Sequence, residues 1–321
     1  MKRIALLCLA LVAALGFTVL SSCSLCEQTV SICSFNIYFL GSSKSRDSTG
    51  LATILEDYDI VIVQELVAPP YSMTYPNGEL AKPEDRARVF FEEMIDRGFS
   101  YWLSEEDTGP ADTIHTNQTR TEWWVAFFKP EKVIPAVDLP RGFMHEDRSG
   151  NRDFERVPYA FPFRTRNGNL DFVLISVHLR PNASPSDKQR RAHELVSISE
   201  WIEANDDIEK DFIILGDMNI QNCTELASAT PANFVSLNNS CLPTNTAATK
   251  KPYDHVMYCP QYTHEVKEDL IIIDLVDKMS DFWTGAGPYP GDPYDHYRFR
   301  STYSDHNPIV FYLQVPDSDD D

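Results

Sequence analysis

Short apolar segments recur along the whole chain, and they restrict the possible folds more than any other feature of the sequence. They are rich in Val, Ile, Phe or Tyr and are bounded by polar stretches, which is typical of β-strands. They comprise residues 31–38, 59–64, 123–128, 171–178, 212–216, 254–258, 271–276 and 308–313. Several are apolar throughout, so we expect strands that are covered on both faces.

Two longer segments, 83–97 and 186–204, predict helices, because their apolar residues recur at helical spacing along one face. Pro83 suits the first turn of the first helix, and Ser186 or Asp187 is expected to cap the second. Strands interleaved with helices indicate an α/β fold. The sequence contains no internal repeat and no clear linker, so we expect one domain over residues 30–314.

The first 22 residues predict a secretory leader. Lys2 and Arg3 precede an apolar run over residues 4–20, and a retained membrane anchor is the alternative. Leu20-Ser21-Ser22-Cys23 resembles a bacterial lipoprotein signal, which implies lipidation of Cys23. Residues 23–29 would then be a short tether. The expected location is extracytoplasmic, on the cell envelope, where the acyl chains would hold the protein to the membrane. Ser24 favours the outer membrane.

The chain is strongly acidic, with a net charge of −20. Loss of the leader would remove two positive residues and no acidic ones, and so would leave −22. Such a charge argues against tight non-specific binding of nucleic acid, although it permits local phosphate contacts. Residues 315–321 are expected to form an acidic, disordered tail.

Seven cysteines are present, at positions 8, 23, 26, 33, 223, 241 and 259. No pair has the spacing of a zinc site, so a zinc site is rejected. Cys223 and Cys241 bracket a loop-rich segment, and their pairing is left open. The other mature cysteines adjoin apolar runs and are expected to be buried thiols.

Polar side chains stand at the ends of the apolar segments, in an order that suggests chemistry. Along the chain they are Asn36, Gln64-Glu65, His178, Gly216-Asp217-Met218-Asn219, Tyr253-Asp254 and Ser304-Asp305-His306-Asn307-Pro308. Buried carboxylates are costly unless they are paired or bind a metal. Oxygen ligands of this kind select Mg²⁺, with Mn²⁺ or Ca²⁺ as alternatives.

Two of these motifs also predict how groups converge. Asp217 and Asn219 are two residues apart, so in an extended segment both side chains can reach one phosphate or metal. His178 and His306, with acids available, suggest two histidine–carboxylate pairs for proton transfer.

These motifs resemble the endonuclease/exonuclease/phosphatase superfamily, and most closely its DNase I-like branch, over roughly residues 30–314. The resemblance implies a four-layer sandwich, in which two mixed β-sheets pack face to face with helices outside. It also implies an enzyme in which a metal-oriented water attacks a phosphodiester.

The resemblance further assigns roles to single residues. Catalysis would involve Asp217 and two pairs, Asp254 with His306 and Glu122 with His178. Phosphate contacts would come from Asn219, Asn36 and from Arg156, which stands before a strand-like segment. The metal ligands would be Glu65, as the principal one, with Asp305, Asn36 and Asp217.

The substrate is harder to assign. The Tyr253-Asp254 motif, Glu122 and Arg156 favour a DNase I-like endonuclease acting on DNA. Leu66-Val67 departs from that pattern, because related nucleases often place an arginine two residues after the acid. Alternatives are a sphingomyelinase-like phospholipid hydrolase, another phosphodiesterase or phosphatase, and an inactive surface binding protein on the same fold. No protein partner is implied.

Two histidine motifs are excluded from the predicted site. Asp295-His296 follows no strand, and His255 should point away from Asp254 by strand alternation. Residues 282–300 predict a long loop near the entrance of the site, where it could affect substrate choice.

Overall fold

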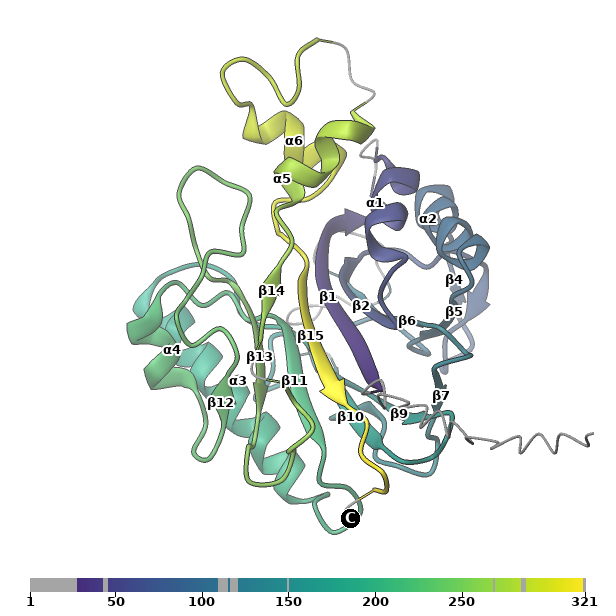
Figure 1. Cartoon of the computed structure of the whole chain (residues 1–321), viewed down its shortest axis with the longest axis vertical. Helices are drawn as coiled ribbons and strands as arrows, with labels where there is room; N and C mark the ends of the chain where they lie inside the picture. Colours follow the sequence, from purple (N-terminus) through teal and green to yellow (C-terminus); the bar gives the residue numbers. More distant parts are fainter. Residues whose placement is uncertain are drawn as a thin grey trace, which may run out of the picture.

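The computed structural model describes residues 28–42, 46–108, 115, 121–148, 150–267, 269–283 and 287–319. Its strands form two large sheets that pack face to face (Figure 1). The first sheet has the order β14 (Ile271–Ile272), β15 (Ile309–Gln314), β1 (Thr29–Leu40), β2 (Ile60–Leu66), β6 (Trp123–Phe128) and β5 (Ser100–Leu103). The second has the order β12 (Val235–Ser236), β13 (Asp254–Tyr258), β11 (Phe212–Asp217), β10 (Asp171–His178), β9 (Tyr159–Thr165) and β7 (Val133–Pro135), and β8 (Gly142–Phe143) also pairs with β9.

Both sheets are mixed. β1 runs parallel to β2, and β10 runs parallel to β11, while their other neighbours are antiparallel. A separate hairpin joins β3 (Met73–Thr74) to β4 (Leu80–Ala81). The parallel pairs matter for function, because the carboxyl ends of neighbouring parallel strands meet at one edge of a sheet.

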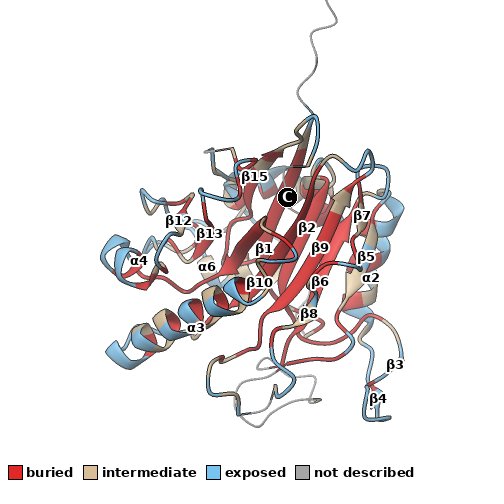
Figure 2. Ribbon diagram, turned by 90° about the horizontal axis from the view of Figure 1, so that it is seen from below, coloured by how far each residue is buried: buried red, intermediate tan, exposed pale blue. Residues whose placement is uncertain are grey.

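Helices cover the outer faces of the two sheets. Figure 2 shows buried strands in the middle, with α2 and α3 on opposite sides and their outer faces exposed. The helices are α1 (Ser48–Leu55), α2 (Asp85–Asp96), α3 (Pro185–Glu203), α4 (Cys223–Ala229), α5 (Leu275–Lys278), the 3₁₀ turn Met279–Phe282 and α6 (His296–Thr302). α1 and α2 pack on the first sheet, and α3 and α4 pack on the second, which gives the expected four-layer sandwich.

The alternation of side chains along β2 shows how the layers are built. Ile60 and Ile62 point into the core between the sheets, whereas Val61 and Val63 point to the helices of the first sheet. Because successive side chains of a strand face opposite ways, both faces of β2 must be apolar. The uniformly apolar segments of the sequence are therefore strands buried on both faces.

The expected boundaries differ from the observed ones at helix starts. α3 begins at Pro185, and its cap is Ser184, not Ser186 or Asp187. Ser184 accepts a hydrogen bond from the Asp187 amide, and the Asp187 side chain accepts one from the Ser184 amide. The two residues thus form a reciprocal capping box at the start of α3. α2 begins at Asp85, so Pro83 lies outside the helix.

One expected strand, 271–276, is wrong over most of its length. Only Ile271–Ile272 pair in a sheet, and Asp274 then caps the short helix α5 by accepting a hydrogen bond from the Asp277 amide. A side-chain cap of this kind favours a helix start over continued strand pairing.

The described cysteines include one disulfide and two free thiols. Cys223 and Cys241 form a disulfide, with their Cα atoms 5.7 Å apart. Cys33 and Cys259 are buried free thiols, as expected. Cys26 lies outside the described residues.

The structure describes the two ends of the chain only in part. The predicted leader, Cys23 and most of the tether lie outside the described residues, as do residues 320–321 of the tail. Within the expected tail, the Val315 amide donates to the Gln28 carbonyl and the Asp171 amide donates to Asp319, although disorder was expected there. Within the described ranges, none of the helices combines the length and apolar character that a membrane crossing requires.

Gly216 is expected to tolerate no side chain. Its φ is +141°, and a Cβ there would lie 2.1 Å from the Val177 carbonyl oxygen on the neighbouring strand. We expect Gly216→Ala to lower the free energy of unfolding by at least about 2 kcal/mol, because strained backbone and overpacking each cost about 1–3 kcal/mol. Urea unfolding would measure this. Gly78→Ala is the matched control, because Gly78 also has positive φ but has nothing within 4 Å of its Cβ position. Equal losses in the two variants would contradict the steric argument.

Candidate active site

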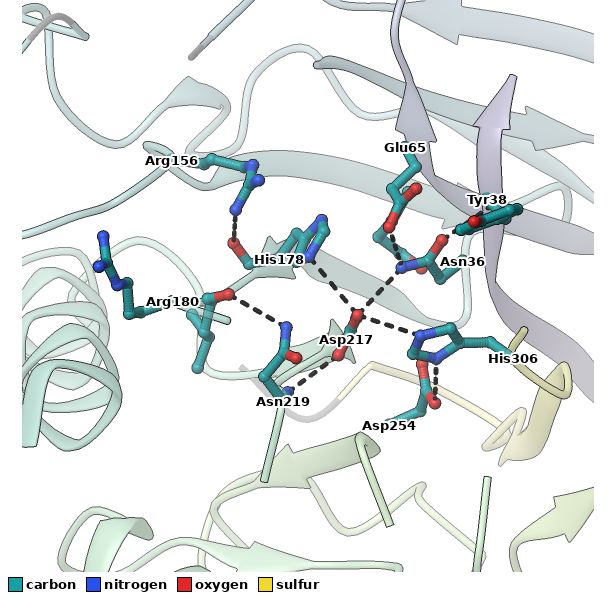
Figure 3. Close-up of polar contacts among 12 residues, drawn as sticks. Asn36, Tyr38, Glu65, Arg156, His178, Arg180, Asp217, Asn219, Asp254 and His306 are labelled. Atoms are coloured by element: carbon teal, nitrogen blue, oxygen red, sulfur yellow. Dashed lines mark hydrogen bonds and ion pairs between the residues drawn. The ribbon is translucent and has the colours of Figure 1, made fainter. Parts of the chain in front are cut away.

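The polar motifs meet in a cleft at one end of the sandwich, where β1, β2, β10 and β11 end and β13 begins (Figure 3). Pairing of the strands brings them together, since His178 of β10 stands opposite Asp217 of β11, and Asp217 stands opposite Asp254 of β13. The cleft is lined by Tyr38, Phe39, Glu65, Arg156, His178, Pro181, Asn182, Ala183, Asp217, Asn219, Gln221, Tyr253, Asp305 and His306.

Asp217 is the centre of the site. Its Oδ2 atom accepts a hydrogen bond of 3.0 Å from Asn36, and it lies 3.5 Å from Nε2 of His178 and 3.4 Å from Nε2 of His306. Its Oδ1 atom accepts a hydrogen bond from the Asn219 amide at 2.9 Å. One carboxylate thus faces both histidines, and a phosphoryl group seated there would be within reach of each imidazole.

His178 belongs to a buried chain of charges. Its Nδ1 atom lies 2.8 Å from Glu122 Oε1, and the same oxygen lies 2.6 Å from Nε of Arg156. Burial alone would raise the pKa of Glu122, but Arg156 and His178 lower it, so this carboxylate stays ionised. The predicted pair of Glu122 and His178 is therefore present. Its Nδ1 contact leaves Nε2 of His178 directed at Asp217.

His306 forms the second predicted pair. Its Nδ1 atom lies 2.8 Å from Oδ2 of Asp254, which also accepts a hydrogen bond from the Thr244 hydroxyl at 2.5 Å. Burial would lower the pKa of His306, but Asp254 and Asp217 raise it well above its usual value. The Ser304 hydroxyl accepts from the His306 amide and donates to the Asn36 carbonyl, which fixes this loop against β1.

Glu65 is held by a strained turn at the end of β1. Its two oxygens accept hydrogen bonds of 2.9 Å from the Asn36 side chain and from the Phe39 amide. Tyr38, Phe39 and Glu65 all have positive φ, between +60° and +63°. Bulky residues rarely adopt this conformation, which costs about 1–3 kcal/mol for each residue and persists only where the surrounding structure imposes it. The turn positions the Glu65 carboxylate through the amide of Phe39.

The residues of the site fit a divalent cation. Burial raises the pKa of Glu65 to about 7, so its negative charge is poorly compensated by the protein alone. Asp305 has a buried Oδ1 atom that accepts no hydrogen bond among the described residues. Oxygen or nitrogen atoms of Glu65, His178 and Asp217 lie within 4.8 Å of one another. Carboxylate oxygens gathered in this way suit Mg²⁺, Mn²⁺ or Ca²⁺.

The three predicted phosphate-binding residues, Asn219, Arg156 and Asn36, differ in the groups that their side chains contact. Asn219 has φ of +53° and lines the cleft, with its side-chain amide donating to the Leu179 carbonyl. Arg156 also lines the cleft, but its Nε atom is engaged by Glu122. Asn36 donates hydrogen bonds from its side-chain nitrogen to Glu65 and Asp217, so it connects the carboxylates, and its Oδ1 accepts from the Tyr38 amide. The predicted roles of these residues in binding phosphate or metal remain predictions.

Arg46 is a residue of the site that no sequence pattern identified. Its guanidinium donates to the carbonyls of Ile37, Tyr38 and Tyr303, and so it ties the strained turn to the end of α6. Burial lowers its pKa to about 10, against the opposing charge of Glu65 and Asp305. It precedes a helix rather than a strand, so no strand-end pattern could have identified it.

The two excluded histidine motifs lie outside the catalytic cluster, as expected. Asp295 caps α6 by accepting a hydrogen bond from the Arg298 amide. His255 is fully buried, with Nδ1 2.9 Å from the Ser236 hydroxyl and Nε2 2.7 Å from the Pro252 carbonyl. These contacts fit a neutral imidazole with a structural role.

Burial of His255 predicts a pH dependence of stability. Burial lowers its pKa to about 4, whereas an unfolded histidine has a pKa of about 6.5. Its stabilising contribution is therefore complete above pH 6.5 and is lost as the pH falls towards 4, because only the unfolded chain then binds the proton. We expect a loss of about 3 kcal/mol from this group.

Urea unfolding of the wild type and of His255→Gln at pH 7.5 and pH 4.5 measures this contribution. The glutamine variant should be less stable at pH 7.5 but should lose less free energy of unfolding on acidification. Identical losses in the two proteins would show that His255 does not titrate in this way.

A four-layer sandwich whose strand ends carry two histidine–carboxylate pairs and a cluster of acids defines a phosphoric ester hydrolase of the DNase I-like class. Residues 33–306 match the sequence model of the Endonuclease/Exonuclease/phosphatase family, and the chain belongs to that family. Its members are hydrolases of phosphoric esters and generally use divalent metal ions. No protein with a curated description matches the sequence.

Solved structures show the same fold at low sequence identity. A family protein from Bacteroides thetaiotaomicron is 14% identical, with a TM-score of 0.52, and the match covers 90% of this chain and 98% of that one. TDP2 from D. rerio, complexed with a single-strand DNA product, gives 14%, 0.52, 90% and 100% for the same quantities. A mannosyl-6-phosphatase from B. thetaiotaomicron gives 14%, 0.52, 88% and 98%. Likeness at this identity establishes the fold.

Proposed function

We propose that this protein is a divalent-metal-dependent endonuclease of the cell envelope. One observation carries the proposal: Oδ2 of Asp217 lies within 3.5 Å of Nε2 of both His178 and His306, and each histidine is backed by a buried carboxylate. This arrangement provides proton transfer on both sides of a phosphodiester, to the attacking water and to the leaving oxygen.

The side chains divide the work by position. Glu65, Asp305 and Asp217 would hold the metal ion, which, when bound, polarises the phosphoryl oxygen and stabilises developing charge. Glu122 and Asp254 orient the two imidazoles through their Nδ1 atoms. Each Nε2 atom then remains available to hold or move a proton in the cleft.

A nucleic-acid substrate is favoured over the alternatives by two features. The motif Tyr253-Asp254, together with Glu122 and Arg156, resembles the DNase I-like branch, and Tyr253 lines the cleft next to the catalytic groups. A structural neighbour of the same fold, TDP2, is complexed with a DNA product. One feature departs from the pattern of related nucleases. Leu66 and Val67 are buried, so the position where those nucleases often carry an arginine presents no charge here.

The test is cleavage of supercoiled plasmid by the purified protein in Mg²⁺, with EDTA and the Asp217→Asn variant as controls. Metal-dependent nicking that the variant lacks is the expected result. Absence of nicking, combined with hydrolysis of sphingomyelin or of a sugar phosphate, would replace the nuclease by one of the other phosphoric ester hydrolases. Inactivity towards all three would favour a binding protein.

Anchoring in the envelope is proposed from the leader sequence. Lipidation of Cys23 would place the catalytic domain outside the cytoplasm on a short tether, and several acyl chains would make the attachment stable. Radiolabelled palmitate should be incorporated into the wild-type protein but not into Cys23→Ser, which should remain an unprocessed precursor. Labelling of both proteins would contradict the assignment.

A further inference from the structure

Beside the cleft, α6 carries an arginine and a tyrosine that have no role in the proposed catalytic cluster. α5 and α6 stand at the end of the sandwich, beyond the carboxyl end of β1 (Figure 1). From α6, Arg300 lies over two tyrosine rings, with its guanidinium carbon 5.4 Å from the ring centre of Tyr38 and 5.2 Å from that of Tyr297. Tyr38 lines the catalytic cleft, so this stack of rings and guanidinium borders the reaction site.

Arg300 has no anionic partner within the described part of the chain. Its Nε atom is buried and unpaired, and neither an ion pair nor a side-chain hydrogen bond of its guanidinium is found among those residues. The other arginines near the cleft differ in this respect, because Arg156 contacts Glu122 and Arg46 donates to backbone carbonyls. Arg300 is thus a cation beside the cleft that has no anionic partner among the described residues and is available to a ligand.

The surroundings of Arg300 are suited to a nucleotide. Tyr297 is 70% exposed, so one face of its ring is open to stack on a ligand. Burial lowers the pKa of His296, the charge of Asp305 opposes this shift, and the nearby positive charges of Arg300 and Lys250 add to it. Arg300 and the open ring of Tyr297 therefore stand together beside the cleft, in a chain whose net charge is −20.

We propose that Arg300, Tyr297 and Tyr38 form a flanking subsite that binds the nucleotide next to the scissile phosphodiester in single-stranded nucleic acid. This inference rests on the proposed nuclease function and names its substrate class. The guanidinium contacts the neighbouring phosphate, and the exposed face of Tyr297 stacks on an unpaired base.

Single strands, rather than duplexes, fit these residues for a physical reason. Base stacking on an aromatic side chain requires a base that is free of its own stack, and it tolerates any sequence because every base has a π-face. Duplex binding depends on many phosphate contacts, which the acidic chain disfavours. A stacked guanidinium also keeps its in-plane N–H groups available for a phosphate, since cation–π contact uses only its face.

The experiment compares two substrates in Mg²⁺: a single-stranded oligonucleotide, as DNA and as RNA, and the small diester bis(4-nitrophenyl) phosphate. The variants are Arg300→Ala and Tyr297→Ala. Each should lower kcat/KM for the oligonucleotide about tenfold more than for the small diester, on the scale of one lost stacking contact. The DNA and RNA arms show which sugar the subsite accepts. Anisotropy of a labelled oligonucleotide with inactive Asp217→Asn should show weaker binding when Arg300→Ala is added.

A matched control exists at the other end of the second sheet. Lys210 lies 5.0 Å from the ring centre of Tyr262, which is the same kind of contact beyond the far end of β13. Lys210→Ala and Tyr262→Ala should change neither substrate selectivity nor oligonucleotide affinity.

The outcomes separate this inference from the proposed function. Plasmid nicking with no selective loss in the Arg300→Ala and Tyr297→Ala variants would overturn the flanking subsite and leave the nuclease standing. The same holds if the wild type cleaves duplex DNA faster than single strands. Hydrolysis of the small diester without cleavage of any nucleic acid would overturn both.

Discussion

Replacing His306 by alanine is expected to lower kcat/KM for phosphodiester hydrolysis by at least about 10²-fold, the scale for losing a positioned acid or base. The structure supplies the physical reason. Asp254 fixes Nδ1 of His306 at 2.8 Å, so Nε2 faces Asp217 and the cleft. Alanine would remove the proposed proton-transfer group and leave Asp254 buried, with the Thr244 hydroxyl as its remaining side-chain partner among the described residues.

The measurement is steady-state hydrolysis at saturating Mg²⁺, with circular dichroism to confirm folding. His193→Ala is the matched control, because His193 also pairs with an aspartate, Asp153, at 3.0 Å, but does so on the exposed face of α3. We expect that variant to retain wild-type kinetics. Activity of His306→Ala within threefold of the wild type would remove His306 from the mechanism.

Replacing Glu65 by glutamine should lower metal-dependent activity by about 10³-fold, because charge stabilisation by a metal ion contributes several kcal/mol. Glu65 is the buried carboxylate whose pKa is raised to about 7, and a bound cation would relieve that unfavourable charge. Glutamine keeps the shape of the side chain but has no charge, so the affinity for Mg²⁺ should fall.

Thermal unfolding provides a readout that does not depend on activity. Mg²⁺ at one hundred times its Kd should stabilise the wild type by about 2.7 kcal/mol, and the Tm should rise accordingly. The rise should be lost in Glu65→Gln. It should persist in Glu194→Gln. Glu194 is also a buried carboxylate with a pKa raised by burial, but it accepts hydrogen bonds from the Glu155 and Arg180 amides, in the segments before β9 and after β10. A metal-dependent rise of equal size in Glu65→Gln would exclude Glu65 as a ligand.

Much of this site could be predicted because its residues stand beside recognisable strands. His178, Asp217 and Asp254 each adjoin a run of apolar residues, and strand pairing then brings their ends together. Glu122 was reached through resemblance, and the structure places it against His178. The α/β class followed from the apolar runs together with two segments of helical spacing, whereas the stacking of the two sheets came from the resemblance.

Other features have no local signature. The positive φ values of Tyr38 and Phe39 run against the preference of bulky residues, so only the surrounding contacts impose them. Arg46 acts on carbonyls of residues as distant as Tyr303, and sequence patterns do not report such contacts. The segment after Ile272 was predicted as a strand from its apolar residues. In the structure, Asp274 caps a short helix there instead.

The hydrogen bond from Asn36 to Asp217 joins the two sheets and spans 181 positions of the sequence. Neither half of the chain can assemble the site alone, because Glu65 of β2 and His178 of β10 belong to different sheets. Contacts between residues so distant in sequence form only after a large loss of chain entropy. During refolding, catalytic activity should therefore return with the slowest phase, after secondary structure has formed. In the cell, the hydrolase would therefore be inactive until the domain has folded. A partly folded chain would not cleave phosphoric esters.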